Sequence, residues 1–517
     1  MAARADTTSA RRRPGRPVLE CGAPTHLVSM TERWRRHPTV AALLSFLFPG
    51  LGQAYLGRRR LAAILAAPVV ILILGVLLLL TVFSSDNRNL FLSGSFLVAV
   101  LLVDMALMAW RLLAIAEAAF GQRPEPAGRW RRAAGIGLVV VLLATTVGTH
   151  AWAGLVINRL DAALGDVFSG GQGSGAGGGS EVGPGRTERP PINQPDYHWD
   201  GTQRITFLLL GVDAGPGRGE SLTDTILAVS IDPVAKTAVM VSVPRDTGYL
   251  PLPDRSVYSD ALYPQKINQL ATDAGLAPEA WCPDLPADRG PECGIRTLER
   301  AISLYLGIPI EYYAQVDLQG FADLIDAVGG LTLCLPGRMV DPQYSGPTWP
   351  THGIELPAGC THYDGVRALA YARIRKGWIE MPDGSVEYQN DFKRADRQQK
   401  VLLALRSEFA NANLIFELPR ILDAVGSTVL TDFPRSKAGD LASLLPVITG
   451  PGIDRMVLGY PDYVDAPTDP ELNYLLIPRR DDVRAGMQQL LGPGTALQGW
   501  YLGSHADGPP DSSAAGG

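Results

Sequence analysis

The sequence predicts a mixed α/β domain preceded by an all-α membrane region. Long apolar runs with few charges occur before residue 158, and a stretch rich in Gly, Ser and Pro follows them. After residue 199, short β-branched runs alternate with segments of helical periodicity. Because strands and helices interleave there, we expect a three-layer α/β/α architecture for that part of the chain.

A chain of 517 residues is too long for one compact domain. We expect five parts, in this order: N-terminal cytoplasmic segment 1–38, membrane region 39–157, flexible linker 158–199, folded α/β domain 200–500 and disordered tail 501–517. The linker and the tail are assigned from their Gly, Ser and Pro content, which cannot build a core. The net charge of -6 does not favour a nucleic-acid partner, since nucleic-acid-binding domains are usually strongly basic.

Three apolar runs, 61–83, 90–110 and 133–157, are each long enough, at ~20 residues, to cross a bilayer. A shorter stretch, 39–56, is interrupted by proline and glycine. We expect this stretch to form a re-entrant or interfacial hairpin, and a fourth span is the alternative. Asp104, inside the second run, is either a functional intramembrane carboxylate or a hydrogen-bonding partner of a neighbouring helix.

Arginines decide the expected orientation. They cluster on both sides of the hairpin and within 123–132, whereas the loop 84–89 contains only one. Since cytoplasmic loops are enriched in Lys and Arg, the N-terminus and these clusters are expected in the cytoplasm. Three crossings then place the folded domain outside the cell, in a multi-pass membrane protein. A fourth span would return that domain to the cytoplasm.

Four of the five cysteines follow the membrane region. In an exported domain, an even set of cysteines indicates disulfides. Three pairings are possible, and we favour the two local ones, Cys282 with Cys293 and Cys334 with Cys360. A four-cysteine zinc site is the alternative, but it usually contains C-x-x-C pairs, and the sequence has none.

Within the folded domain, apolar and β-branched runs predict strands at 204–212, 226–231, 237–243 and 330–335. Apolar residues at helical spacing predict helices at 295–306, 321–328 and 395–410. An Asp-Pro pair at 232–233 predicts a turn between two of the strands, and a Gly-Gly pair at 329–330 ends a helix.

Charged residues gather where these elements end. Asp213 directly follows the first strand, and Asp224 lies eleven residues later. The alternate spacing of Arg373 and Arg375 predicts that both lie on one face of a strand. Further polar residues occur around the strand and helix ends: Arg245, Lys266, Arg394, Arg397 and Gln398. The four-residue spacing of 394 and 398 places both on one helical face.

Arginines converging with two carboxylates suit a magnesium-bound pyrophosphate. Guanidinium groups match phosphate oxygens in bidentate geometry, and two aspartates can hold Mg²⁺ together with phosphate oxygens. Each residue alone has a simpler explanation, since aspartates often cap helices or form turns and arginines often lie on solvated surfaces. Their joint occurrence is what favours a phosphate site.

The motifs of this domain resemble those of the LytR–CpsA–Psr family of membrane-anchored glycopolymer transferases. The similar blocks, in the family's order, are FLLLGVD, LTDTILAVSIDPVAKTAVMVSVPRDT, QKINQL, LGIPIEYYAQVDLQGFADLIDAVGGLTL, YDGVRALAYARIRK and DFKRADRQQ. They cover roughly residues 203–410. One departure is Leu222, where relatives often have arginine; Arg218 is a candidate replacement.

The resemblance implies an extracellular catalytic domain that uses Mg²⁺ to transfer a glycopolymer from a polyprenyl-pyrophosphate carrier to peptidoglycan. It implies a phosphodiester linkage to a muramic acid hydroxyl. By motif position, Asp213 and Asp224 match the metal-binding carboxylates, and Asp224 is also a candidate base. The phosphate-contacting set would be Arg245, Arg373, Arg375, Arg394 and Gln398, with Lys266 and Arg397 in support.

Two other functions stay open at this point. A non-catalytic protein that binds polyprenyl phosphate for regulation would need no metal carboxylates. A polyprenyl-pyrophosphate hydrolase would use the same site, with water in place of the sugar hydroxyl as acceptor.

Overall fold

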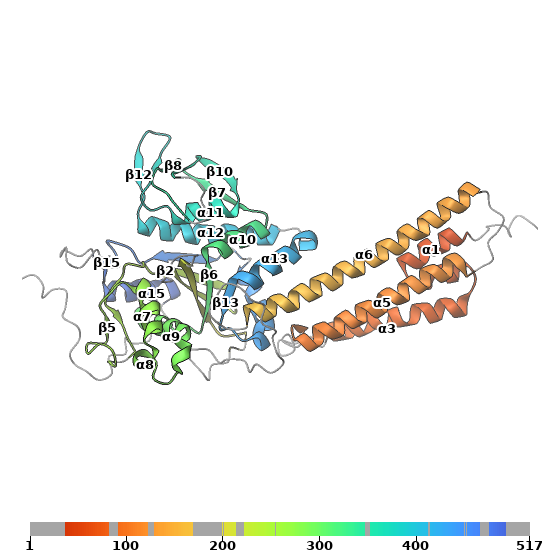
Figure 1. Ribbon diagram of the computed structural model, residues 1–517, viewed down its shortest axis with the longest axis horizontal. Helices are drawn as coiled ribbons and strands as arrows, with labels where there is room; N and C mark the ends of the chain where they lie inside the picture. Colours follow the sequence, from red (N-terminus) through yellow and green to blue (C-terminus); the bar gives the residue numbers. More distant parts are fainter. Residues whose placement is uncertain are drawn as a thin grey trace, which may run out of the picture. The chain divides into compact units, whose positions relative to one another are not determined.

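The computed structural model (Figure 1) describes residues 37–81, 91–121, 129–168, 199, 201–213, 222–253, 255–346, 352–411, 414–448, 450, 452–465 and 475–492. The N-terminal segment up to residue 36, most of the expected linker, Arg218 and the expected tail lie outside these ranges. By its internal contacts the chain divides into two units: Met1–Leu74 with Leu107–Val147, and Gly75–Ala106 with Gly148–Gly517.

In the part of the chain that the structure describes, three helices are long and apolar enough to cross a membrane: α3 (Arg59–Thr81), α5 (Gly94–Phe120) and α6 (Arg129–Val167). The last of these corrects the expected boundary, because residues 158–167 are helical and not part of a flexible linker. Their sequence, NRLDAALGDV, contains two leucines, two alanines and one arginine, which favour helix, and its single glycine does not end the helix.

The first unit contains two short helices, α1 (Pro38–Leu47) and α2 (Leu51–Tyr55). Gln53 of α2 is fully buried, accepts a hydrogen bond from Ser45 Oγ at 3.0 Å and donates one to Glu117 Oε2 at 2.9 Å. The 10 residues of α1 span only ~15 Å, about half the hydrocarbon thickness of a bilayer. This length argues against a fourth crossing.

In the second unit, Asp104 of α5 is paired with a neighbouring helix. Its Oδ1 lies 2.7 Å from Nδ1 of His150 in α6. This contact is the hydrogen-bonding role that the sequence left as one of two possibilities.

A six-stranded mixed sheet forms the centre of the folded domain, in the order β13-β6-β1-β2-β3-β14. Its strands are β1 (Ile205–Asp213), β2 (Leu222–Asp232), β3 (Thr237–Ser242), β6 (Tyr312–Asp317), β13 (Val429–Thr431) and β14 (Ile453–Val457). β1 runs antiparallel to β2 and parallel to β6, and β3 runs antiparallel to β2. The predicted α/β class is therefore confirmed.

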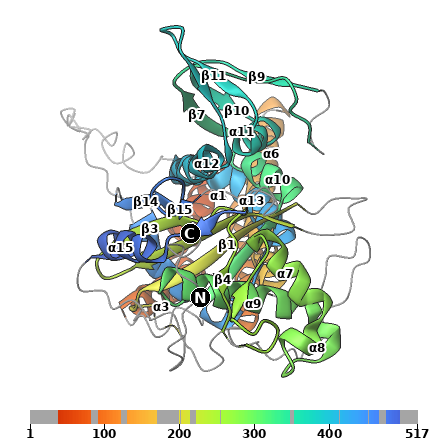
Figure 2. The ribbon, with the colours of Figure 1, turned by 90° about the vertical axis from the view of Figure 1, so that its left-hand side faces the viewer.

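Helices contact both faces of this sheet (Figure 2). One face is covered by α7 (Ile267–Leu276) and α9 (Gly290–Leu306). The opposite face lies beside α10 (Leu318–Ala327), α11 (Gly365–Arg373), α12 (Asp391–Asn411) and α13 (Leu414–Thr428). The remaining elements are short, apart from η3 and α15: β4 (Leu250–Pro251), β5 (Leu262–Tyr263), α8 (Pro278–Trp281), η2 (Ala287–Arg289), η3 (Arg435–Leu444), α14 (Leu445–Ile448), β15 (Val464–Asp465), β16 (Ile477–Pro478) and α15 (Arg480–Leu491).

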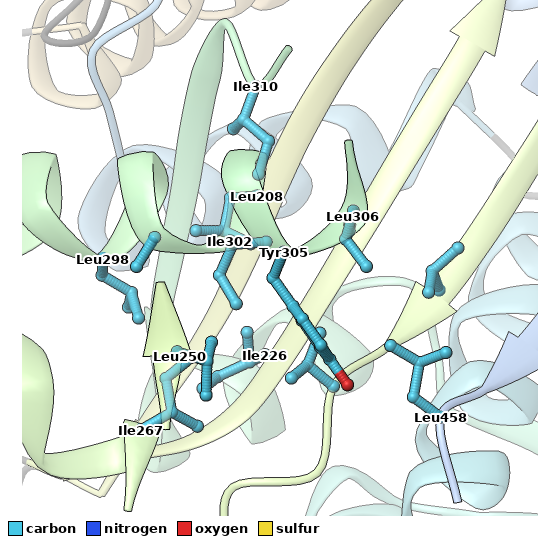
Figure 3. Packing of buried hydrophobic residues seen from close by; sticks show 14 of the residues in the cluster. Leu208, Ile226, Leu250, Ile267, Leu298, Ile302, Tyr305, Leu306, Ile310 and Leu458 are labelled. Carbon is cyan, nitrogen blue, oxygen red and sulfur yellow. The ribbon is translucent and has the colours of Figure 1, made fainter. Parts of the chain in front are cut away.

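The α9 face of the sheet forms the largest buried core. In Figure 3, Ile302 and Tyr305 of α9 point toward Leu208 of β1 and Ile226 of β2. All four side chains are at most 2% exposed. Burying side chains of this size contributes ~1.5–3 kcal/mol each, so this core holds the sheet in place.

A small lobe joins α10, α11 and α12 to the remaining strands. These strands are β7 (Leu331–Leu335), β8 (Arg338–Asp341), β9 (Ile354–Leu356), β10 (Gly359–Tyr363), β11 (Trp378–Glu380) and β12 (Val386–Tyr388). Cys334 and Cys360 lie opposite each other on β7 and β10 and form a disulfide. The second disulfide joins Cys282 and Cys293, so both favoured pairings are present.

The strands expected from β-branched runs are present as β1, β2, β3 and β7, and the expected helices lie within α9, α10 and α12. The Asp-Pro turn also forms, because Asp232 Oδ1 accepts hydrogen bonds from the backbone N–H groups of Val234 and Ala235. The Gly-Gly pair that follows α10 has φ values of +92° and +103°, which favour glycine.

Buried acids lie beside the start of β1. Glu311 is 3% exposed and accepts a hydrogen bond from the Thr206 N–H at 2.7 Å. Burial raises the pKa of Glu311 from 4.5 to about 8. Burial, and then the nearby Asp432, also raises the pKa of Glu299, which is fully buried. The folded protein therefore holds protons that the unfolded chain would release.

We expect Glu311→Gln to weaken the pH dependence of stability. The raised pKa of Glu311 means that its contribution to stability is complete below pH 4.5 and is lost as the pH rises through about 8. The glutamine keeps an acceptor oxygen for Thr206 but does not titrate. The free energy of unfolding is measured by chemical denaturation of the full chain in detergent. Between pH 5 and 8 it should fall less for the variant than for the native protein, so that the variant is the more stable of the two at pH 8. Glu355→Gln, an exposed carboxylate, is the control; equal pH profiles for the native protein and Glu311→Gln would contradict the prediction.

Candidate phosphate site

A β-bulge positions Asp224 on the central β1–β2 pair. Gly211 lies opposite Thr225, whereas Val212 lies opposite Thr223, so Asp224 is the extra residue of β2. Bulges redirect side chains and are frequent next to active sites. The sequence showed that Asp224 comes near a strand but gave no sign of the bulge.

Arg245, shortly after β3, is surrounded by carboxylates. Its Nη1 donates to Asp224 Oδ1 at 2.6 Å, and its Nε lies 3.8 Å from Asp391 Oδ1 and 4.0 Å from Asp246 Oδ1. Burial by itself would lower the pKa of Arg245, but these carboxylates outweigh it and raise the pKa. Arg245 therefore stays charged and fixed in position.

Asp391, the first residue of α12, bridges two arginines. Besides Arg245, it accepts a hydrogen bond from Arg394 Nη2 at 3.1 Å. Arg394 also donates to the backbone carbonyl of Asp224 at 3.2 Å. Burial raises the pKa of Asp391, and the two arginines oppose this shift. Burial lowers the pKa of Arg394. The sequence assigned no role to Asp391, which here links the two arginines.

Arg373 and Arg375 do not lie on a strand, as their alternate spacing had suggested. Arg373 ends α11, which begins after the N-cap residue Asp364, and Arg375 follows the helix. Two arginines separated by one residue occur in helices as well as in strands. The spacing of Arg373 and Arg375 alone therefore could not distinguish a strand from the end of a helix. Arg373 Nη2 lies 3.6 Å from Asp213 Oδ2, at the end of β1.

A polar cavity of about 780 Å³ gathers most of the predicted residues. It is lined by Asp213, Leu222, Asp224, Arg245, Asp341, Gln343, Tyr344, Ser345, Arg373, Arg375, Lys376 and Arg394. Arginines and aspartates from the sheet, from α11 and from α12 therefore face one space. The sequence analysis assigned no role to the segment 341–345, which begins at the last residue of β8, or to Lys376, which follows α11.

An apolar pocket of about 210 Å³ lies on the same face of the sheet. Leu209 and Leu227 line it from the sheet, Phe321 from α10, and Leu402 from α12. It shares three lining residues with the polar cavity: Asp224, Arg373 and Arg394. The apolar and charged spaces therefore meet at these side chains.

Three predicted residues lie elsewhere. Arg397 is 4% exposed and donates to the carbonyl groups of Tyr371 and Ile374 and to Gln389, so it lines neither cavity. Burial lowers the pKa of Arg397 to about 10. Lys266 pairs with Asp246 at 3.0 Å and also lines neither cavity. Gln398 lines the apolar pocket, on the same face of α12 as Arg394, and not the polar cavity.

The donor set of the polar cavity fits a hard divalent cation. Asp213 and Asp224 offer oxygen atoms, and each is already held by an arginine. Among the described residues, no cluster of three or more His, Cys, Asp or Glu side chains could hold a metal by itself. Mg²⁺ is often bound by one or two carboxylates with water and substrate phosphates, so two aspartates are sufficient if a phosphate ligand is present.

The LytR_cpsA_psr family model matches residues 184–464, which is more than half of the chain. The chain belongs to the LytR–CpsA–Psr family. A polyisoprenyl-teichoic acid–peptidoglycan teichoic acid transferase TagU from Oceanobacillus iheyensis is 32% identical over 45% of this chain and 60% of its own length. The regulatory protein MsrR from Staphylococcus aureus is 31% identical over 45% of this chain and 58% of its own length.

The chain thus spans less than two thirds of the length of these relatives. Among solved structures, that of Bacillus subtilis TagV is 25% identical, covers 56% of this chain and 98% of its own, and has a TM-score of 0.41. Leu222, where the resemblance to the LytR–CpsA–Psr family led us to expect an arginine, lines the polar cavity.

We expect Arg397→Lys to destabilise the domain although it keeps the charge. A lysine cannot reproduce the planar set of donors that serves three acceptors, and each unsatisfied buried acceptor costs ~1–3 kcal/mol. The free energy of unfolding should fall by roughly 2–4 kcal/mol, measured by chemical denaturation. Arg406→Lys, on the same helix, should change it by less than ~0.5 kcal/mol. A similarly small effect of both substitutions would show that the Arg397 contacts contribute little.

Proposed function

We propose that this protein transfers a glycopolymer from a polyprenyl-pyrophosphate carrier to peptidoglycan. The observation that supports this most strongly is the meeting of an apolar pocket with an arginine-lined cavity at Asp224, Arg373 and Arg394. A ligand that fits both spaces has a hydrocarbon chain and an anionic head. A polyprenyl pyrophosphate has these two parts, and the relatives named as transferases act on polyisoprenyl-linked teichoic acid.

The arginines bind and orient the pyrophosphate in this proposal. Arg245, Arg373, Arg375 and Arg394 surround the cavity with fixed donors that match phosphate oxygens. Asp213 and Asp224 would hold Mg²⁺, which when bound neutralises charge on the phosphate leaving group. Fixed donors aimed at developing charge lower the barrier without having to reorganise during the reaction.

The reaction then moves one phosphoryl-linked glycan. The acceptor hydroxyl of a muramic acid residue attacks the phosphorus next to the glycan, and its proton passes to the Asp224 carboxylate. The bond from that phosphorus to the bridging oxygen breaks, and polyprenyl monophosphate leaves. The product is a phosphodiester between glycopolymer and peptidoglycan. Arg245, which donates to Asp224 Oδ1, holds this carboxylate in position to accept the proton.

Placement of the domain outside the cell is part of the proposal. The peptidoglycan acceptor lies there, the arginine clusters favour that orientation, and the two disulfides fit an oxidising compartment. The protein would then be a multi-pass membrane enzyme with an exported three-layer α/β/α domain.

A regulatory protein that binds polyprenyl phosphate without turnover is the second candidate, because one similar relative is named a regulatory protein. A hydrolase that releases the glycan phosphate to water is the third. These functions differ in their products, so one assay separates them.

The test uses the full chain in lipid vesicles with a polyprenyl-pyrophosphate glycan and a peptidoglycan oligomer. We expect a phosphodiester-linked product that requires Mg²⁺ and disappears on chelation. Asp224→Asn and Arg245→Ala should lower its rate by at least ~100-fold, since each removes charge from the reacting centre. Arg338→Ala, an exposed arginine of the lobe, should leave the rate within about twofold.

Other outcomes identify the alternatives. Tight binding of the lipid with no product and no metal dependence would support the regulatory candidate. Metal-dependent release of glycan phosphate that does not require the acceptor would support the hydrolase.

A further inference from the structure

The C-terminal end of α6 is part of the folded domain. Ala163 and Val167 are only 6% and 7% exposed. The ring of Phe168, directly after the helix, lies 6.2 Å from that of Phe433 and packs into the aromatic cluster at the edge of the sheet. A helix that is apolar enough to cross a membrane therefore continues into the core of this domain.

The contact between α6 and α13 is close. A Cβ atom on Gly426 of α13 would lie 2.8 Å from the Cα of Ala163, so no larger residue fits at 426 without moving the helices. Ion pairs flank this contact, between Arg159 and Asp423 and between Asp161 and Arg435. Because exposed ion pairs contribute little by themselves, the close Ala–Gly packing defines the interface.

The Gly- and Ser-rich segment does not determine how far the folded domain lies from the membrane span. It follows Phe168 and precedes Trp199, and the rings of both residues lie beside Phe433, at 6.2 and 6.3 Å. The two residues that flank positions 169–198 therefore pack at the same aromatic cluster. The length of this segment cannot change the distance between α6 and the phosphate site.

We propose that the docked end of α6 positions the phosphate site at a fixed height over the membrane, in reach of a membrane-embedded donor. Arg159, Ala163, Asp423 and Gly426 are positioning residues in this arrangement. The inference rests on the proposed transferase function, because a fixed height matters only for a substrate anchored in the bilayer.

The lengths are consistent with this role. The apolar run ends at residue 157, and the helical stretch from there to Val167 is ~15 Å long. The interfacial layer on each side of a bilayer is only ~5–8 Å thick, so docking begins close to the membrane surface. A free linker of about 40 residues would instead let the site range over ~35 Å.

The first experiment locks the docked state. Asp161→Cys and Arg435→Cys, which replace a flanking ion pair, are combined in a Cys21→Ser background, and the full chain is treated in vesicles with a short bifunctional thiol cross-linker. We expect efficient cross-linking, and we expect the cross-linked protein to transfer glycan from a full-length polyprenyl donor within twofold of the uncross-linked rate. Absence of the cross-link, or its formation with loss of transfer, would overturn the proposal.

The second experiment opens the interface. Gly426→Leu should lower turnover of the vesicle-bound donor by at least tenfold, while turnover of a water-soluble short-chain donor stays within twofold. Asp423→Arg should have a weaker effect of the same kind, which Arg159→Asp in the same chain partly reverses. Arg420→Asp, on the exposed side of α13, is the matched control. Equal loss with both donors would mean that the interface serves stability alone, and would overturn the proposal.

A deletion of residues 172–186 tests the bypassed segment. The roughly 15 residues that remain can extend over ~50 Å, enough to rejoin the two ends. Turnover of the vesicle-bound donor should be unchanged, whereas a tenfold change would show that the segment acts as the tether. If the unaltered protein transfers glycan from neither donor, the transferase function fails, and the cross-linking yield still decides whether α6 is docked.

Discussion

The site depends on one constraint: arginines held in partly buried positions need carboxylates around them. The side chain of Arg245 is 15% exposed, and burial by itself would lower its pKa, but Asp224 and Asp391 outweigh that effect and the pKa is raised. The same two aspartates contact Arg394, through a carboxylate and a backbone carbonyl. Removing either carboxylate would weaken the compensation of these partly buried charges, which costs more than losing a surface ion pair. The protein therefore holds the groups that we propose to bind phosphate in place before any ligand arrives.

The alternation of side chains along the strands explains why the apolar pocket lies on the sheet face opposite α9. Successive residues of a strand point to opposite faces, so Leu208 enters the core beneath α9 and Leu209 faces the other side. Leu209 lies opposite Leu227 on β2, and both line the apolar pocket. Aromatic Tyr305 fills the space on the α9 face, where the core is closed. On the pocket side the helices leave a hollow that ends at charged residues, which is the arrangement that an amphiphilic ligand requires.

Local patterns predicted most of the fold, and contacts between distant segments account for what they missed. β-branched runs identified the strands because their side chains pack on a pleated surface. The bulge that redirects Asp224 arises from pairing with β1, so nothing in its own neighbourhood revealed it. Motif position suggested that Arg397 supports the phosphate contacts, yet its guanidinium donates to the carbonyl groups of Tyr371 and Ile374 and lines neither cavity. Charge and spacing identified which residues gather at the site, and only tertiary contacts separated binding groups from structural ones.

Composition alone also misplaced the start of the linker, because α6 continues to Val167, for a reason that applies to other membrane-anchored proteins. A Gly- and Ser-rich run is flexible as a polymer, but its mechanical effect depends on where its two ends are attached. Here both flanking aromatic residues pack against Phe433, and α6 continues past the apolar run into the domain. The docked end of α6 therefore connects the membrane span to the domain directly. Because this helix is stiffer than the Gly- and Ser-rich segment, the helix determines the distance between the span and the phosphate site. A site held in a thin layer at the membrane surface samples a smaller volume, which raises the effective concentration of a donor anchored in the bilayer. A rigid connection therefore gives a higher effective concentration than a long tether would.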